Sequence, residues 1–283
     1  MKVIKNVLQM QRIALKHLKD DDEIGLVPTM GALHDGHISL FLKSKKNDDV
    51  TIVSIFVNPV QFGPDEDYLK YPRPIKKDLE ICKKNHVDYV FMPSVNDMFS
   101  QNHRTFTEVK TMQDILCGHF RPIHFRGVAT VIVKLFNISY ANRAYFGMKD
   151  FQQLKIIEKM TKDLNFRTKI ISCPIVREKN GLALSSRNSY LSVDERNASV
   201  NISKILKEAM QDFKHKDLVS VKKNTLDKLQ RIINSKIDYA EVVNFNDLSI
   251  ADKNTKKAVF VVAIWIGKTR LIDNIVMTKQ STK

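Results

Sequence analysis

The sequence predicts an α/β fold with a doubly wound parallel sheet, followed by a smaller α+β domain. In the first two-thirds of the chain, short apolar runs alternate with stretches of helical spacing, which is the order of βαβ units. These runs lack a strict apolar–polar alternation, as expected of strands that helices cover on both faces. After about residue 177 the pattern changes to a long helical stretch followed by strand-like runs. Together these observations favour a Rossmann-like first domain and a separate second one.

The elements follow in order along the chain. Residues 3–20 place apolar side chains at helical spacing between charges and predict an opening amphipathic helix. Strands of the first domain are predicted at 23–29, 50–57, 87–93, 143–147 and 169–176. A helical stretch from Asp194 to Ile233 then precedes strands predicted at 239–245, 257–266 and 270–277. We place the domain boundary between residues 176 and 177, which gives domains 1–176 and 177–283.

Composition narrows the possible partners and environment. The 46 Lys and Arg residues against 31 Asp and Glu leave a net charge of +15, which attracts anions. Much of the excess is Lys in amphipathic stretches such as 43–47 and 222–231, so we interpret it as solvated helix faces and expect no nucleic-acid partner. The longest apolar run, 258–267, is about half as long as a membrane-spanning helix, and no membrane association is expected.

The three cysteines, Cys82, Cys117 and Cys173, are far apart and show no CxxC spacing. An odd number at such spacing argues against a disulfide framework and against a structural zinc site. A cytoplasmic location is therefore expected.

The motif PTMGALHDGH at 28–37 follows a predicted strand and precedes a helical segment. Gly31 and Gly36 mark a strand-to-helix turn, which we expect to expose backbone N–H groups beside the positive end of a helix. His34 and His37 are three residues apart, so both can face one side and donate hydrogen bonds to phosphate oxygens. The motif predicts an anion site.

Three further segments carry polar residues after strands or at the domain boundary. In FVNPVQFGPDEDYLKYPR at 56–73, Gln61 offers a donor and an acceptor to a ligand with hydroxyl and carboxylate groups. In YFGMKDFQQLKII at 145–157, Lys149 can neutralise phosphate charge and Asp150 can orient Mg²⁺. In REKNGLALSSRNSYLS at 177–192, Arg187 can bind phosphate with its fork of donors, and two serines can donate to it.

The HxGH string in this context resembles the nucleotidylyltransferases and class I aminoacyl-tRNA synthetases, and the full PTMGALHxGH string resembles the pantothenate synthetases. GxKDxQQ and LSSR match the same family, and GKTRLIDN at 267–274 extends the resemblance over nearly the whole chain. Asn180, Ile123 and Met148 depart from the family pattern. Because Ile123 lies in the loop 118–127, the roles of His124 and Arg126 stay open.

The resemblance implies an ATP-dependent, AMP-forming ligase that joins pantoate to β-alanine through a pantoyl-adenylate, with Mg²⁺, as a homodimer. It implies that Gln61 and Gln153 contact pantoate, Gln61 also contacting β-alanine, and that Asp150 serves the metal. Residues 63–77 resemble a mobile cover over the site. The implied ATP-binding residues are Met30, Gly31, Ala32, Leu33, His34, Asp35, Gly36, His37, Gly147, Met148, Lys149, Asp150, Val176, Leu184, Ser185, Ser186 and Arg187. The implied catalytic residues are His34, His37, Lys149, Ser185, Ser186 and Arg187.

Two other functions remain as alternatives. A nucleotidylyltransferase would use the same HxGH, but the NPVQF and KDFQQ strings resemble pantoate-binding segments. An RNA-binding relative of the tRNA synthetases would suit the charge, but no segment resembles an anticodon-binding domain. The sequence leaves open the base for the amine step, for which His37 is the candidate by resemblance. It also leaves open the dimer interface and whether Asp150 contacts Mg²⁺ directly or through water.

Overall fold

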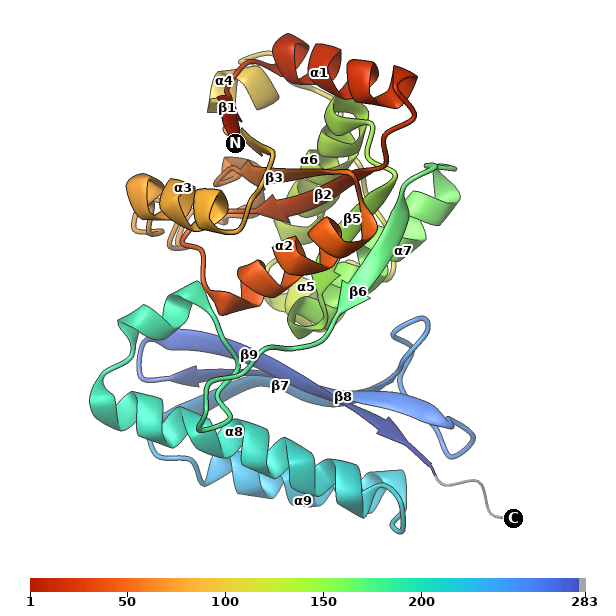
Figure 1. The fold of residues 1–283 in the computed structure, drawn as a ribbon. Coiled ribbons are helices and arrows are strands. Elements are labelled where there is room, and N and C mark those ends of the chain that lie inside the picture. The colour runs from red at the N-terminus through yellow and green to blue at the C-terminus, as the bar shows by residue number, and fades with distance from the viewer. Residues whose placement is uncertain (280–283) are drawn as a thin grey trace. The chain divides into compact units, whose positions relative to one another are not determined.

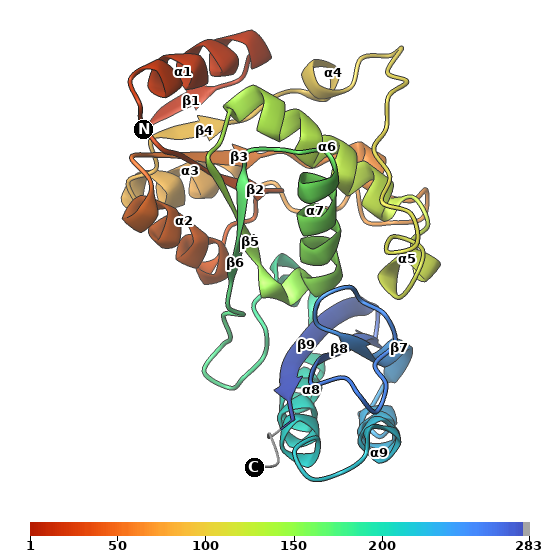
Figure 2. The ribbon, with the colours of Figure 1, turned by 90° about the vertical axis from the view of Figure 1, so that its right-hand side faces the viewer.

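The structure, a computed structural model, describes residues 1–279 of the 283-residue chain. Its internal contacts divide it into two compact units, drawn in Figures 1 and 2. The first unit comprises Met1–Met148 and Ile156–Pro174. The second comprises Lys149–Lys155 and the chain from Ile175 onward. The domain boundary between 176 and 177 stays a prediction.

A six-stranded, all-parallel sheet forms the centre of the first unit, which confirms the predicted fold class. The strand order is β1-β4-β3-β2-β5-β6. Each of the five strands predicted here is present, most of them shorter at their ends than predicted, whereas the edge strand β1 was not predicted. The strands are β1 (Lys2–Ile4), β2 (Ile24–Thr29), β3 (Val50–Ile55), β4 (Tyr89–Phe91), β5 (Arg143–Gly147) and β6 (Lys169–Cys173).

Helices cover both faces of this sheet, with α2 (Asp35–Asn47) and α3 (Ile75–Lys84) on one face and α6 (His124–Ser139) on the other (Figure 2). Phe41 of α2 and Cys82 of α3 are fully buried and belong to one apolar cluster with Val27 and Val53 of the sheet. The remaining helical segments before the second sheet are α1 (Val7–Lys19), η1 (Pro59–Gln61), α4 (Val95–Met98), α5 (Cys117–Phe120), η2 (Met148–Asp150) and α7 (Phe151–Asp163). Residues 149–155, from η2 and the start of α7, belong to the second unit.

The second unit contains a three-stranded antiparallel sheet in the order β7-β8-β9, with two helices packed on it. Alternate residues of β8, such as Phe260 and Val262, belong to the same core as Leu206 of α8. The elements are η3 (Ser186–Tyr190), α8 (Val193–Asp212), α9 (Leu218–Gln230), β7 (Ser235–Asn244), β8 (Lys257–Ile266) and β9 (Thr269–Thr278). Within residues 1–279, no helix has both the length and the apolar character needed to cross a bilayer.

The helical stretch predicted from Asp194 to Ile233 is two helices rather than one. α8 ends at Asp212, and α9 starts after Asp217, whose side chain accepts the Ser220 N–H at 2.9 Å as an N-cap. An N-capping aspartate stabilises a new helix start because it binds a backbone donor that the first turn leaves unpaired. The chain therefore turns back here, and both helices pack on the same sheet.

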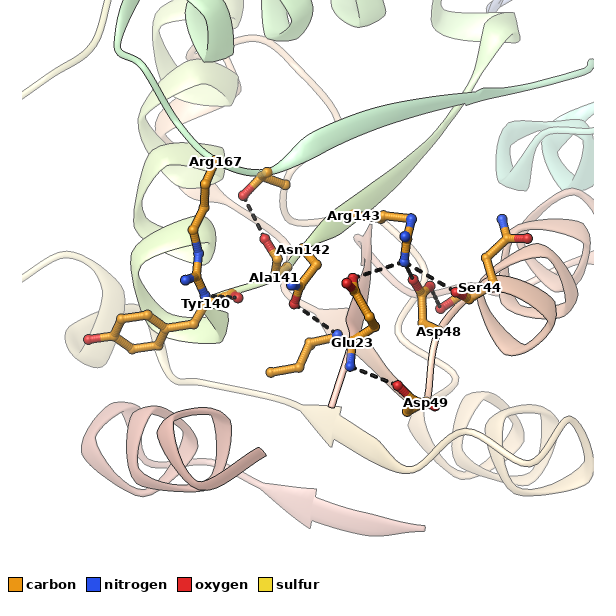
Figure 3. A network of polar contacts seen from close by, with 12 residues as sticks. Glu23, Ser44, Asp48, Asp49, Tyr140, Ala141, Asn142, Arg143 and Arg167 are labelled. Atoms are coloured by element: carbon orange, nitrogen blue, oxygen red, sulfur yellow. Dashed lines mark hydrogen bonds and ion pairs between the residues drawn. The ribbon is translucent and has the colours of Figure 1, made fainter. Parts of the chain in front are cut away.

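A polar network joins the amino ends of the central strands (Figure 3). Arg143 of β5 donates to Glu23 Oε2 at 3.0 Å and to the buried Asp48 Oδ1 at 2.8 Å. Gly25 of β2 leaves room for this carboxylate, because a Cβ there would lie 2.1 Å from Asp48 Oδ2. Hydrogen bonding to Asp48 raises the pKa of Arg143. The network fixes β2 against its neighbours at the amino end and leaves the carboxyl end for other groups.

Candidate active site

Three neighbouring strands of the first unit end side by side. β3, β2 and β5 are adjacent and parallel, so their carboxyl ends lie at one edge of the sheet, where ligands bind in such folds. The segments that follow them are three of the four in which the sequence analysis placed site residues: 56–73, 28–37 and 145–157. A Cβ added to Gly147, the last residue of β5, would meet no atom within 4 Å, so the space beside this strand end is open.

The turn between β2 and α2 carries the HxGH residues. Met30 to Leu33 form the turn, His34 is the N-cap of α2, and Asp35 to His37 are its first three residues. Gly31 and Ala32 both have positive φ, +81° and +51°. This left-handed pair reverses the chain direction within a few residues, so that α2 starts directly beyond the strand end.

Backbone N–H groups of this turn are already used within the first unit. Thr29 Oγ1 accepts one, the Asp78 carboxylate accepts two, and the two histidine rings accept one each. The donors are Gly31, Ala32, Leu33, His34 and Gly36. The prediction that these groups are exposed to an anion is wrong, because side chains of the protein occupy them.

The two histidine side chains form a reciprocal cap at the start of α2. The Nδ1 atom of His34 accepts the Gly36 N–H at 3.1 Å, and the Nδ1 atom of His37 accepts the His34 N–H at 3.3 Å. The ring centroids are 4.1 Å apart. Because Nδ1 accepts in each ring, a neutral imidazole here carries its proton on Nε2. In this tautomer each ring has its N–H donor at Nε2.

Gln61 lies at the end of η1, just beyond β3, and is buried. Its Oε1 accepts a hydrogen bond from Asn58 Nδ2 at 3.1 Å, and its Nε2 lies 3.1 Å from the Sδ atom of Met30. A thioether is a weak acceptor, so the amide N–H groups keep most of their donor capacity for a ligand. The structure thus brings together one residue expected to bind pantoate and one expected to bind ATP.

Asn58 and Gly127 support Gln61 and were not identified from the sequence. Asn58 is buried, and its Nδ2 also donates to the carbonyl of Gly127 at 3.0 Å, which ties η1 to α6. A Cβ at Gly127 would lie 2.4 Å from the Val60 carbonyl oxygen, so glycine allows the helix to approach this closely. NPVQF pointed to the strand end, but nothing in the sequence indicated its partner on α6.

His124 and Arg121 bind the backbone of Gln61. His124 is buried, and its Nδ1 lies 3.0 Å from the Gln61 carbonyl oxygen, which can only accept, so this nitrogen carries a proton. Arg121 forks onto both carboxylate oxygens of Glu66, in the predicted cover segment, and also donates to the Gln61 carbonyl at 3.4 Å. Arg126 instead lies over the Phe106 ring, 4.7 Å from its centroid. His124 thus supports Gln61, whereas the charged group of Arg126 interacts with Phe106 and Glu108.

Beyond β5, η2 carries Lys149 and Asp150, and Gln153 lies in the first turn of α7, half-buried. The Lys149 ammonium is 3.6 Å from Asp150 Oδ2. The side chain of Asn274 on β9 donates to the Lys149 carbonyl at 2.9 Å, and Asn274 is buried. Lys149 and Asn274 both belong to the second unit, so this hydrogen bond is internal to that unit.

The LSSR loop is held in the second unit by a hairpin and an ion pair. The Leu184 N–H donates to the Val176 carbonyl at 3.0 Å, which brings these two expected ATP residues together. Arg177 forks onto the buried Asp273 carboxylate at 2.6 and 2.8 Å. Ser185 caps η3 by accepting the Arg187 N–H at 3.3 Å, and Ser186 and Arg187 start that helix, half-buried.

Lys149 and Ser185 line the same small cavity in the second unit. Asn188 also lines it, and the buried Oδ1 atom of Asn188 has no hydrogen-bond partner within the described chain, while its Nδ2 donates to the Ala183 carbonyl. The other lining residues are Leu182, Ala183, Ile202, Leu271, Ile272 and Asp273. The cavity therefore joins two segments that the sequence analysis treated separately.

This fold and these segments define a class of protein. A doubly wound parallel sheet with an HxGH turn after its second strand in the chain, and a lysine at the end of a neighbouring strand, is the arrangement expected of the HxGH nucleotidylyltransferase superfamily.

Comparison with known proteins identifies the family within this class. The family model for pantoate–β-alanine ligase matches residues 2–276. A pantothenate synthetase from Endomicrobium trichonymphae is 77% identical over 279 residues, covering 99% of each chain. One from a Sulfurihydrogenibium species is 50% identical over 280 residues, covering 97% of this chain and 99% of the relative. The chain belongs to the pantoate–β-alanine ligase family.

Solved structures agree in fold. A pantothenate synthetase from Thermus thermophilus superimposes with a TM-score of 0.92 at 33% identity, covering 97% of this chain and 99% of the other. A pantoate–β-alanine ligase from Francisella tularensis, complexed with β,γ-ATP and β-alanine, gives a TM-score of 0.81 at 38% identity over 98% and 97% of the two chains. The sheet order and the antiparallel second sheet are therefore those of a known enzyme fold.

Proposed function

We propose that the protein performs the reaction for which its family is named, the ligation of pantoate to β-alanine, in two chemical steps that consume ATP. A carboxylate does not condense with an amine at neutral pH, so the acid must first acquire a leaving group. The pantoate carboxylate attacks the α-phosphorus of ATP, pyrophosphate leaves, and pantoyl-adenylate forms. The amine of β-alanine then attacks the acyl carbon, and AMP leaves.

The contact between Gln61 and Met30 carries this proposal. Adenylation requires the acid and the nucleotide to meet with their reacting atoms in van der Waals contact. The residue proposed to bind pantoate lies 3.1 Å from the segment proposed to bind ATP, at adjacent carboxyl ends of the sheet. The complex of the Francisella relative with a form of ATP and β-alanine supports both ligands for this chain.

The side chains provide the donors that the first step needs. Negative charge builds on the phosphoryl oxygens during the attack, and fixed donors and cations stabilise it. We assign this role to the Nε2–H groups of His34 and His37 together with Lys149, Arg187 and the two serines of the LSSR loop. While its Nδ1 accepts the His34 N–H, a neutral His37 ring has its proton on Nε2. His37 therefore acts as a donor rather than as the base for the amine.

Mg²⁺ is part of the proposal, with Asp150 as the residue that holds it. Mg²⁺ is usually bound by one or two carboxylates plus substrate phosphates, and the half-exposed Asp150 carboxylate beside Lys149 fits that donor set. Among residues 1–279, no group of three or more His, Cys, Asp or Glu side chains could form a complete protein cage for a metal. When bound, the ion would neutralise phosphate charge. Full activity in excess chelator would contradict the requirement.

The proposal also includes a homodimer in the cytoplasm, without nucleic-acid or membrane partners. Closed two-fold dimers are the commonest soluble oligomers, and the family resemblance points the same way. The three buried cysteines form no disulfide, which supports a reducing compartment. Light scattering at micromolar concentration should give twice the mass of one chain, and a monomer alone would contradict the dimer.

Exchange of labelled pyrophosphate into ATP tests the two-step reaction. Pantoate should support this exchange without β-alanine, because adenylation is complete before the amine is needed. Amino acids and tRNA, supplied in turn instead of pantoate, should support none. Exchange that strictly requires β-alanine would exclude the two-step mechanism, and exchange driven by an amino acid or by tRNA would exclude the proposed substrate.

A further inference from the structure

Asp78 is a buried acidic residue on α3, outside every segment in which the sequence placed site residues. Its side chain is 0% exposed. The Oδ2 atom accepts the Ala32 N–H at 2.9 Å, and the Oδ1 atom accepts the Leu33 N–H at 2.8 Å. Both carboxylate oxygens are thus bound to the turn that precedes His34.

The backbone of the turn is shaped around this carboxylate. Gly31 and Ala32 are consecutive residues of positive φ, and successive backbone N–H groups in such a turn can converge on one anion. An alanine in this conformation is unfavourable on its own, so the surrounding structure must hold it. A Cβ on Gly31 would lie 2.9 Å from Asp78 Oδ2, so the same carboxylate also accounts for the glycine. The anion that this turn binds is therefore internal.

Hydrogen bonds from the turn offset the free-energy cost of burying the Asp78 carboxylate. Burial raises the pKa of Asp78, while the N–H groups of Leu33 and Ala32, and the charge of Lys77, oppose that rise. A buried carboxylate without such bonds is strongly unfavourable. The Asp78 carboxylate is held in place by the N–H groups of Ala32 and Leu33, and these N–H groups are held in place by the carboxylate. The positions of α3 and the turn therefore depend on each other.

We propose that Asp78 is a positioning residue of the nucleotide site, which fixes the turn so that the Nε2–H groups of His34 and His37 face the bound phosphates. This inference rests on the proposed function. Leu33 immediately precedes His34, and the His34 N–H in turn holds the His37 ring. A shift at residues 32 and 33 therefore moves both imidazoles. With its N–H groups bound to Asp78, the turn recognises phosphate through side chains.

Asp78→Asn is the first test, because it keeps the volume but places an amide donor against a backbone N–H. We expect kcat for pantoate-dependent pyrophosphate exchange to fall about 10- to 100-fold, the usual cost of roughly 1 Å of misplacement. The KM for pantoate should change by less than about twofold, because the side chain of Gln61 is held by Asn58 and contacts this turn only through the weak thioether acceptor of Met30. Glu80→Gln, an exposed acidic position on the same helix, is the matched control and should match the wild type.

A double-mutant cycle separates positioning from a purely structural role. If Asp78 acts through the imidazoles, Asp78→Asn should add little to the loss already caused by His37→Ala. Losses that multiply fully, or an unchanged kcat in Asp78→Asn, would overturn the proposal. If Asp78→Asn fails to fold, Gly31→Ala is the alternative variant, because its new Cβ would lie 2.9 Å from Asp78 Oδ2 and displace the carboxylate. It should likewise lower kcat and leave the KM for pantoate nearly unchanged.

Hydrogen exchange of the peptide 30–34 tests the contact independently of activity. Its amides should exchange faster in Asp78→Asn than in the wild type or in Glu80→Gln. Unchanged protection would overturn the claim that Asp78 holds the turn. If the wild type shows no pantoate-dependent exchange of pyrophosphate, the proposed function fails, and the amide exchange still reports on Asp78.

Discussion

The site residues differ in what they bind before any substrate arrives. The His34 and His37 rings are fixed through Nδ1 and present Nε2–H groups, whereas Gln61 has its oxygen engaged by Asn58 and its amide nitrogen beside a weak thioether acceptor. In the proposed function the imidazoles stabilise charge that develops during reaction, and the Gln61 amide binds pantoate before the reaction begins. This difference leads to separate kinetic consequences.

Substitutions of the residues proposed to stabilise charge should mainly lower kcat, whereas substitutions of the residues proposed to bind pantoate should mainly raise KM. Lys149→Ala and His37→Ala remove groups to which we assign interactions that strengthen in the transition state, so kcat should fall on the order of 10²–10³-fold. Gln61→Ala and Gln153→Ala remove the hydrogen bonds that we propose these residues make to bound pantoate. Each loss should cost roughly 1–3 kcal/mol, so the KM for pantoate should rise with little change in the KM for ATP. Some loss of kcat should accompany this, because loosened pantoate misplaces its carboxylate.

Steady-state kinetics on folded variants measure this division. Lys159→Ala, which removes a half-exposed lysine paired with Asp163 on α7, is the control and should leave both constants unchanged. A Lys149→Ala enzyme altered only in the KM for pantoate, together with a Gln153→Ala enzyme with normal pantoate KM, would refute the role assignments.

The cysteine thiols should be unreactive in the folded protein. Cys82, Cys117 and Cys173 are all buried, and burial raises the pKa of Cys82 to about 12. Because the thiolate is the nucleophile, Ellman's reagent at about pH 8 should label none of the three in minutes and all three in denaturant. Leu69→Cys, at a position 88% exposed, should react at once and serves as the control. Rapid native labelling of Cys82 would contradict this.

The raised pKa of Cys82 also determines how its contribution to the free energy of unfolding changes with pH. The folded-state pKa of Cys82 lies above its ordinary value of 9.0, so the unfolded chain releases this proton first as pH rises. The contribution of Cys82 is therefore fully present below about pH 9 and is lost as pH rises toward 12.

At the scale of elements, residues far apart in sequence support the site. The motif residues are visible in the sequence because strand, turn and helix start follow one another within about ten residues. The residues that support them are not visible in this way. Asp78 is hydrogen-bonded to Leu33, 45 residues away in the sequence, and Asn58 is hydrogen-bonded to Gly127, 69 residues away. Polar side chains such as Asn58 and Asp78 have no local pattern that distinguishes them from surface residues. Only the packing of α3 and α6 against the strand ends reveals them.

Gly127→Ala should disturb pantoate binding through the packing of α6 against η1. The new Cβ would meet the Val60 carbonyl at 2.4 Å and the Gln61 backbone nitrogen at 2.6 Å, so η1 must move. We expect the KM for pantoate to rise roughly tenfold, equivalent to about one lost hydrogen bond, and the unfolding free energy to fall by about 1–3 kcal/mol from overpacking. Asn137→Ala, on the exposed face of α6, is the control. If Gly127→Ala is destabilised but has a normal KM for pantoate, the packing of α6 against η1 does not support pantoate binding, and the prediction is wrong.

At the scale of the whole molecule, the sequence predicted the fold class but not the order of the strands. Apolar runs identified the βαβ alternation, since buried strands need continuous apolar residues. The order β1-β4-β3-β2-β5-β6 depends on crossover connections that no local pattern encodes. β1 was missed because three residues carry no periodicity, and the break between α8 and α9 was missed because Asp217 lies within a continuous helical pattern.

Net charge is the whole-molecule property that keeps RNA binding as an alternative. The charge of +15 attracts any polyanion over long distances, but salt screens such attraction beyond about 8 Å at physiological ionic strength. Nonspecific binding of nucleic acid falls steeply with salt, because it depends on release of counterions. ATP in the proposed site would contact half-buried imidazoles at short range, so its binding should be less sensitive to salt.

Transfer RNA should therefore inhibit pantoate-dependent pyrophosphate exchange only at low salt. We expect tRNA and heparin to inhibit to a similar extent in dilute buffer, because both act as polyanions, and to lose most of that effect at about 0.15 M salt. The KM for ATP should change much less over the same range, since its contacts lie within a Debye length. Inhibition by tRNA that persists at about 0.15 M salt and exceeds that of heparin would indicate a dedicated RNA surface and would favour the RNA-binding alternative.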